Sequence, residues 1–190
     1  MDLNEAFMNG IEKCPEFKRA LKIVSNNSYG NTWLIGGMVY RTIVSEIYGR
    51  PRPRVDLDFI VEYDSPSFNL PRGWEVEENS FSNPKFRNGE ETIDYVPLKN
   101  IFSIRNRGLE PKIENYLSGV PLTVNSIVFD IEKQKLMGEI GIQAIIAKTV
   151  AVNNFHFAKY AAEKKKKTLN QFIKEKADSL NFTPVFPKGK

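Results

Sequence analysis

The chain has 190 residues, of which 41% are hydrophobic, enough for one domain with a real core and a short appendage. Its single cysteine, Cys14, and its single histidine, His156, exclude an intramolecular disulfide, a zinc cluster and a conventional Ser-His or Cys-His hydrolase. The sequence has no secretory-signal profile, and its longest apolar stretch falls short of the roughly 20 residues of a membrane span. We therefore expect a cytoplasmic protein without a membrane partner.

The net charge of +4 originates in the C-terminal tail. Residues 161–190 carry eight lysines and three acidic residues, a net +5, which leaves −1 for residues 1–160. Any attraction to nucleic acid should therefore concentrate in the tail.

The first quarter of the chain predicts two short helices broken at Pro15, then a strand, a glycine turn and a third helix. Residues 31–37, NTWLIGG, are typical of a short buried strand that ends in glycines. From Val39, apolar residues recur at four-residue spacing as far as Gly49, a natural helix stop.

The following segments predict a mixed sheet. Residues 55–63 and 74–79 are typical of strands, and Asn88-Gly89 predicts the turn of a hairpin. Downstream we expect a helix over residues 110–119, a hairpin over 122–140, a short helix over 142–147 and one long lysine-rich helix from His156 to Leu180. The fold class is therefore α+β, with residues 1–155 as one domain and residues 156–190 as a basic C-terminal helix and tail.

Two aspartates lie one residue apart in the strand VDLDFIVEY. Side chains two positions apart on a strand point the same way, so Asp56 and Asp58 share a face while Leu57 enters the core. Carboxylates this close repel each other unless a cation joins them, and Mg²⁺ favours a few carboxylates together with substrate phosphate oxygens. Asp94, on a neighbouring strand, would complete a cluster able to hold two metal ions for in-line phosphoryl or nucleotidyl transfer.

The glycine pair precedes a helix and suits an anion. Without Cβ atoms, Gly36 and Gly37 let a phosphate approach backbone N–H groups at the helix start, where the helix dipole also favours negative charge. Each motif alone also fits a structural role, since a glycine pair makes tight turns and an Asp-x-Asp pair can line a solvated strand edge. Their joint occurrence in this order favours the metal site.

The chain resembles the nucleotidyltransferase domain of the DNA polymerase beta superfamily in four segments: LIGGMVYR, GRPRPRVDLDFIV, NSFSNPKFRNGEETIDYVPLK and PLTVNSIVFDIEKQKLMGEIG. The similarity is to the head domain of class II CCA-adding enzymes and bacterial poly(A) polymerases. It implies a nucleotidyltransferase fold, a mixed sheet covered by helices. It also implies that the glycine pair contacts a triphosphate, that the first two aspartates bind magnesium and that the third, Asp94, assists the attacking hydroxyl. Thr123 and Asn125 match a Thr-hydrophobic-Asn signature that serves nucleotide recognition.

The sequence departs from this family at two places. Tyr40 stands where the family usually has an arginine, and Arg41 follows it about 100° further around the helix; we keep Arg41 as a candidate nucleotide contact. Positions 119–121 hold Gly, Val and Pro where the family has two arginines and an aspartate. The usual ribose and phosphate contacts are therefore missing at these positions. We expect selectivity among nucleotides to be relaxed, altered or determined by a protein partner. Because one predicted helix follows the head, we do not expect this chain to add CCA by itself.

Arg54 and a cluster of four lysines each have a structural and a functional interpretation. Arg54 either balances the carboxylates from a solvated loop or binds phosphate. The cluster Lys164, Lys165, Lys166 and Lys167 either solubilises a terminal helix or docks a nucleic-acid backbone.

Taken together, these patterns predict a magnesium-dependent nucleotidyltransferase. It would move a nucleoside monophosphate from an NTP to a hydroxyl and release pyrophosphate, with two Mg²⁺ ions held by Asp56, Asp58 and Asp94. RNA, reached through the basic tail, is the slightly favoured acceptor over a protein or a small molecule. The alternative is a non-catalytic module that binds nucleotide or RNA.

Overall fold

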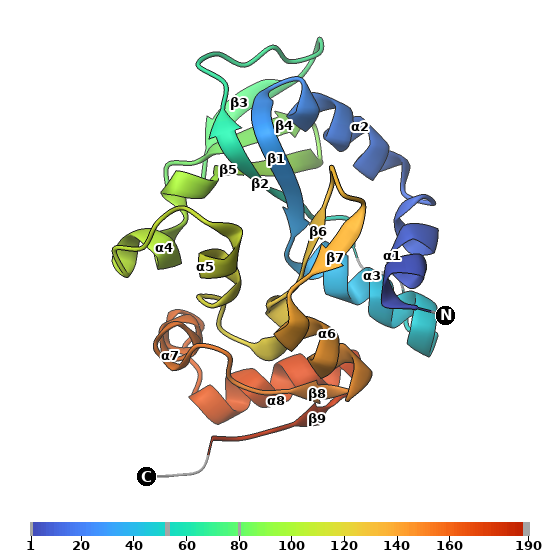
Figure 1. Cartoon of the computed structure of the whole chain (residues 1–190), viewed down its shortest axis with the longest axis vertical. Coiled ribbons are helices and arrows are strands. Elements are labelled where there is room, and N and C mark those ends of the chain that lie inside the picture. The colour runs from blue at the N-terminus through green and yellow to red at the C-terminus, as the bar shows by residue number, and fades with distance from the viewer. Residues whose placement is uncertain (1, 52–53, 80, 188–190) are drawn as a thin grey trace.

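The computed structural model describes residues 2–51, 54–79 and 81–187. Its main feature is a seven-stranded sheet in the order β3-β4-β5-β2-β1-β6-β7 (Figure 1). Strands β2 and β5 pair in parallel and the other neighbours are antiparallel, which confirms the predicted mixed sheet and α+β class. The strands are β1 Ser28–Ile35, β2 Leu57–Asp64, β3 Glu75–Glu78, β4 Pro84–Asn88, β5 Glu91–Pro97, β6 Val128–Asp130 and β7 Lys135–Met137.

Helices lie on both faces of this sheet (Figure 1). One face is covered by α1 (Leu3–Ile11), α2 (Pro15–Ser25) and α3 (Gly37–Tyr48), and the other by α4 (Phe102–Asn106) and α5 (Ile113–Leu117). The remaining elements are η1 Leu98–Asn100, η2 Thr123–Asn125, α6 Glu139–Ile146, α7 Phe155–Lys164, α8 Leu169–Leu180 and a small parallel pair, β8 Thr149–Val150 with β9 Thr183–Pro184. In the described part of the chain, no helix is both long and apolar enough to cross a bilayer.

Local sequence signals account for the early elements. Pro15 is the first residue of α2, so it separates two helices as expected, because proline lacks an N–H that a helix interior would need. Gly49 ends α3 in the left-handed region, with φ 63°. Gly89, with φ 59°, lies in the turn of the β4–β5 hairpin, which confirms the turn predicted at Asn88-Gly89.

The alternation of side chains in β2 gives the sheet two different faces. Leu57 and Phe59 belong to the larger hydrophobic cluster, beneath α1–α3, whereas Ile60 belongs to a smaller cluster with residues of α4 and α5. Strand β5 repeats the pattern, because Tyr95 packs in the larger cluster and Val96 against the smaller one. Asp58 and Asp94 lie two positions before Ile60 and Val96 on the same strands, so their side chains also point toward the face of α4 and α5.

The prediction of one continuous helix from His156 to Leu180 is wrong. The segment forms two helices, α7 and α8, and the break falls within the lysine run, where Lys166 has a φ of 56°. Thr168 is the N-cap of α8 and forms a capping box with Gln171. The Thr168 hydroxyl accepts from the Gln171 backbone N–H, and the Gln171 side chain accepts from the Thr168 N–H.

Helix α8 is built into the core that supports the sheet. Phe172, Ile173, Ala177 and Leu180 are buried in the same hydrophobic cluster as β2 and α3. Strand β9, which follows α8, pairs with β8 and closes this layer (Figure 1). The C-terminal segment therefore contributes directly to the stability of the sheet.

We expect Ile173→Ala to lower the free energy of unfolding of the whole chain by about 2–4 kcal/mol, because it leaves a cavity in a fully buried place. Urea denaturation followed by tryptophan fluorescence measures this change. Lys174→Ala, an exposed neighbour on the same helix, is the matched control and should change stability by less than about 0.5 kcal/mol. Equal midpoints for Ile173→Ala and the wild type would show that α8 folds apart from the sheet.

Candidate active site

Three aspartates meet at the centre of the sheet because of the way the interior strands β2 and β5 pair. Asp58 of β2 lies opposite Asp94 of β5 in the parallel register, and Asp56 lies just before β2. One carboxylate oxygen from each residue lies within 4.8 Å of the other two. Carboxylate oxygens at this spacing are suited to a divalent cation with a preference for oxygen ligands.

Asp58 is the electrostatically strained member of this cluster. Burial raises the pKa of its carboxyl, the charges of Asp56 and Asp94 raise it further, and Lys85 acts in the opposite direction, so the pKa rises from 3.8 to about 7. A half-buried neighbour, Tyr116 of α5, also has its pKa raised, first by burial and then by the charge of Asp58. A cation bound between the aspartates would relieve this repulsion.

Asp94 is fixed by two neighbours. Lys85 Nζ of β4 lies 3.2 Å from one Asp94 oxygen, and Asn79 Nδ2 donates to the other at 3.3 Å. Because the Asn79 side chain also accepts backbone N–H bonds from Phe81 and Asn83, the turn between β3 and β4 is joined to the Asp94 carboxylate.

The glycine turn packs against the same cluster. Gly36 has a φ of 75°, and a Cβ at this position would lie 2.6 Å from Asp58 Oδ2, so a side chain here would collide with the carboxylate. At Gly37, a Cβ would find its nearest neighbours at 3.8 Å. Helix α3 begins at Gly37 without a side-chain cap among the described residues, so its first N–H groups are available to an anion.

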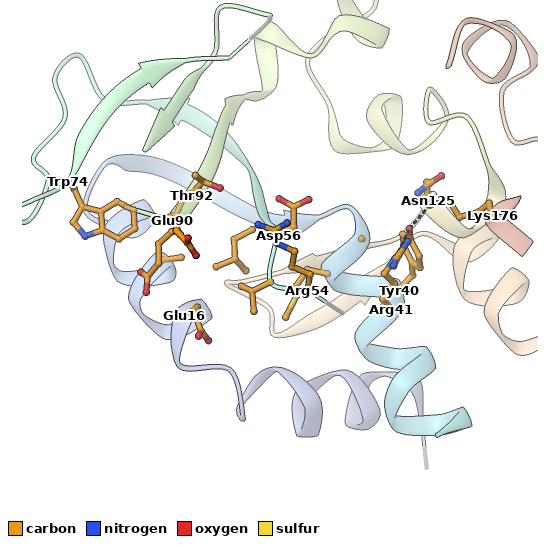
Figure 2. A pocket seen from close by; sticks show the side chains of 17 residues that line it. Glu16, Tyr40, Arg41, Arg54, Asp56, Trp74, Glu90, Thr92, Asn125 and Lys176 are labelled. Atoms are coloured by element: carbon orange, nitrogen blue, oxygen red, sulfur yellow. Dashed lines mark hydrogen bonds between the residues drawn. The ribbon is translucent and has the colours of Figure 1, made fainter. Parts of the chain in front are cut away.

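A cavity of about 760 Å³ opens beside Asp56. Figure 2 shows its two ends, with Glu16, Trp74 and Glu90 at one and Tyr40, Arg41 and Lys176 at the other. Arg54 and Asp56 lie between them (Figure 2). A ligand with an anionic part would therefore be drawn to the end formed by α3 and α8.

By sequence, the chain matches no family model and no curated protein. Its fold matches solved structures. A CCA-adding enzyme in complex with ATP has a TM-score of 0.61 at 15% identity, over 97% of this chain and 42% of that one. The Bacillus stearothermophilus CCA-adding enzyme in complex with CTP also has a TM-score of 0.61, at 16% identity, over 90% and 41%. The Thermotoga maritima CCA-adding enzyme complexed with tRNA has a TM-score of 0.52 at 12% identity, over 93% and 46%.

This chain has the nucleotidyltransferase fold of CCA-adding enzymes. The resemblance inferred from the four sequence segments is thereby confirmed for the fold. The chain spans less than half the length of each of these enzymes.

The nucleotidyltransferase fold distributes the predicted nucleotide-binding residues unevenly. Gly37, Arg41, Arg54 and Asn125 line the cavity together with Asp56. Thr123 does not line it: its hydroxyl accepts from the Ala151 backbone N–H at 3.1 Å and so holds η2 to the chain that follows α6.

Sequence reasoning missed Lys176, which lies 136 positions from its partner. Lys176 Nζ donates to Tyr40 Oη at 2.9 Å and lies 5.4 Å from the centre of that ring (Figure 2). Burial would raise the pKa of Tyr40, but the charges of Lys176 and Arg41 outweigh it and lower the pKa. Tyr40 therefore replaces the expected arginine with an aromatic ring that holds two cations at the cavity wall.

The four predicted nucleic-acid lysines have different surroundings. Lys164 lies over the ring of Phe81 at 4.8 Å, Lys165 lies over Phe172 at 5.4 Å, and Lys167 pairs with Glu175. They line the turn between α7 and α8 rather than encircling a helix.

We expect Asp58→Asn to stabilise the metal-free protein at pH 8 by roughly 2–4 kcal/mol. The folded-state pKa of Asp58, about 7, exceeds its ordinary value of 3.8, so stability is lost as pH rises from about 4 to 7 and stays reduced above it. The gain from Asp58→Asn should therefore shrink toward zero near pH 4. Thermal unfolding in EDTA across this pH range measures it.

The matched control is Asp64→Asn, a half-buried aspartate in the same strand that pairs with Lys99. It should show no such pH-dependent gain. Added Mg²⁺ should raise the melting temperature of the wild type and of Asp64→Asn but not of Asp58→Asn. An equal response to Mg²⁺ in all three proteins would place the ion elsewhere.

Proposed function

We propose that this chain is a magnesium-dependent nucleotidyltransferase that moves a nucleoside monophosphate from an NTP to an acceptor hydroxyl, with pyrophosphate as the other product. The observation that carries the proposal is the convergence of Asp56, Asp58 and Asp94 within 4.8 Å beside the uncapped start of α3. A purely structural site has no reason to bury Asp58 between like charges, because that burial costs stability.

The cavity has the size and the charge distribution for a nucleotide. Its volume of about 760 Å³ is in the usual range for small-molecule sites. We place the triphosphate at the end where α3 begins, against Gly36 and Gly37, with Arg41 and Lys176 on the cavity wall. Arg54 reaches the phosphates from beside Asp56, and Asn125 contacts the nucleoside.

The donor set fits Mg²⁺, since three carboxylates and substrate phosphates supply the oxygen ligands that this ion prefers. Two ions held by Asp56, Asp58 and Asp94 would neutralise the charge that develops on the attacking and leaving oxygens. Asp94, positioned by Lys85 and Asn79, orients the acceptor hydroxyl and accepts its proton. Most of the rate enhancement then comes from positioning and charge neutralisation.

For the acceptor we favour the end of an RNA, because the lysines at the turn between α7 and α8 add positive charge beside Phe81. Phe81 lies two residues after Asn79, whose side chain donates to Asp94. A partner protein that completes the nucleotide pocket belongs to the proposal, because positions 119–121 lack the charged side chains expected there. A non-catalytic nucleotide- or RNA-binding module is the second candidate. It would bind NTP at the same cavity and release no pyrophosphate.

The test is to incubate the protein with Mg²⁺, each labelled NTP and a cell extract or total RNA, and to identify what becomes labelled. We expect label on a macromolecule or metabolite, with Asp58→Asn and Asp94→Asn each slowing transfer by at least about 100-fold. Asp64→Asn, on the same strand as Asp58, should transfer at the wild-type rate. Comparable turnover in Asp58→Asn would refute the proposal, and NTP binding without pyrophosphate release would support the non-catalytic module.

A second test concerns the triphosphate. We expect Lys176→Ala to raise the KM for the NTP about tenfold, because it removes one cation from the cavity wall, and to change kcat little. Calorimetry should show weaker binding of inorganic triphosphate and unchanged binding of the nucleoside. Lys174→Ala, on the same helix and paired with Asp178, is the control. Equal losses for nucleoside and triphosphate would indicate that Lys176 only supports the fold.

A further inference from the structure

Three aromatic side chains from distant parts of the sequence form an exposed group, here called the aromatic platform: Phe81, Phe102 and Tyr160. The ring centres of Phe81 and Phe102 are 6.0 Å apart, and those of Phe102 and Tyr160 are 5.6 Å apart. Their exposed fractions are 48%, 42% and 42%. Large rings this exposed cost free energy in water, so a gathered group of them marks a binding surface.

Positive charge borders the aromatic platform. Lys164 Nζ lies 4.8 Å from the centre of the Phe81 ring. Residues 155–167, which form α7 and the turn after it, carry five lysines and one glutamate. Exposed rings beside ammonium groups match the two parts of a single-stranded nucleic acid, because unpaired bases stack on rings and phosphates pair with lysines.

The aromatic platform is joined to the candidate active site through one side chain. Asn79 Oδ1 accepts from the Phe81 backbone N–H at 2.9 Å, and Asn79 Nδ2 donates to Asp94 at 3.3 Å. The side chain of Asp94 projects from the sheet face that α4 covers, and α4 carries Phe102. Helices α4 and α7 lie on the same side of the molecule (Figure 1).

We propose that the aromatic platform holds the 3′ end of a single-stranded RNA, with bases stacked on Phe81, Phe102 and Tyr160 and a phosphate paired with Lys164. This inference rests on the proposed function and names the acceptor of that reaction. The NTP enters through the cavity beside Asp56, and the acceptor reaches Asp94 from the opposite side, past Asn79. The aromatic platform and the lysines beside it favour RNA over a protein partner, because a single strand offers both unpaired bases for the rings and phosphates for the ammonium groups.

The test is fluorescence anisotropy with a labelled single-stranded RNA of about twelve nucleotides, without NTP or metal. We expect Phe81→Ala and Tyr160→Ala each to weaken binding about tenfold, since stacking on one aromatic ring contributes that much per base. Lys164→Ala should reduce the slope of log affinity against log salt by about 0.7, the value for one phosphate of a single strand.

Tyr63→Ala is the matched control, because Tyr63 is 61% exposed near the far end of β2 and belongs to neither site. It should bind RNA like the wild type. Thermal unfolding of each variant identifies losses that come from the fold. Binding of an RNA duplex as tight as that of the single strand would overturn the inference, because paired bases cannot stack on the platform. So would a dimer in sedimentation that Phe81→Ala dissociates, because the rings would then be covered by a second copy.

The outcomes separate this inference from the proposed function. If RNA binding depends on Phe81 while no nucleotide is ever transferred, the aromatic platform stands and the catalytic proposal fails. If transfer to RNA proceeds equally well in Phe81→Ala and Tyr160→Ala, the acceptor binds elsewhere and only this inference fails.

Discussion

The parallel pairing of β2 with β5 is the constraint on which the candidate site depends. It sets Asp58 opposite Asp94, with both side chains on the face of α4 and α5. A shift of one residue in this register would move Asp94 to the other face and bring Ile93 or Tyr95 into its place, breaking both the hydrophobic cluster and the acidic one. Burial of Ile93 and Tyr95 under α1–α3 therefore fixes the positions of the charged groups on the opposite face.

The same pairing creates an electrostatic conflict that the fold does not resolve by itself. Lys85 compensates part of the charge of Asp94, whereas Asp58 is pressed against Gly36, where any side chain would collide with it. The carboxyl of Asp58 therefore loses water on one side and meets like charges on the other, which is why its pKa is raised to about 7. A cation bound between the aspartates would relieve this repulsion and stabilise the folded chain, as any ligand does that binds only the folded state.

Local patterns in the sequence were sufficient for the strands of the main sheet, the Asn88-Gly89 hairpin and the order of glycine pair, helix and aspartates, because each depends on neighbours within a few residues. They did not predict the small pair β8 and β9. Contacts between distant residues were beyond such reasoning. No periodicity links Lys176 to Tyr40, or brings Phe81, Phe102 and Tyr160 together, since these contacts exist only after the sheet and the C-terminal helices have packed. The continuous helix was mispredicted because the capping box at Thr168 lies inside a run of good helix formers, and the box decides the break.

The C-terminal helices α7 and α8 contribute both to the core of the sheet and to the two proposed binding places. Helix α8 buries Ile173 in the core of the sheet and presents Lys176 to the cavity, while α7 carries Tyr160 and Lys164 to the aromatic platform. A lysine on a free, solvated tail would attract phosphates without fixing their geometry, because a flexible side chain loses entropy when it binds. A lysine on a buried helix is already positioned, so α7 and α8 direct the positive charge of the tail toward two defined places on either side of the aspartates.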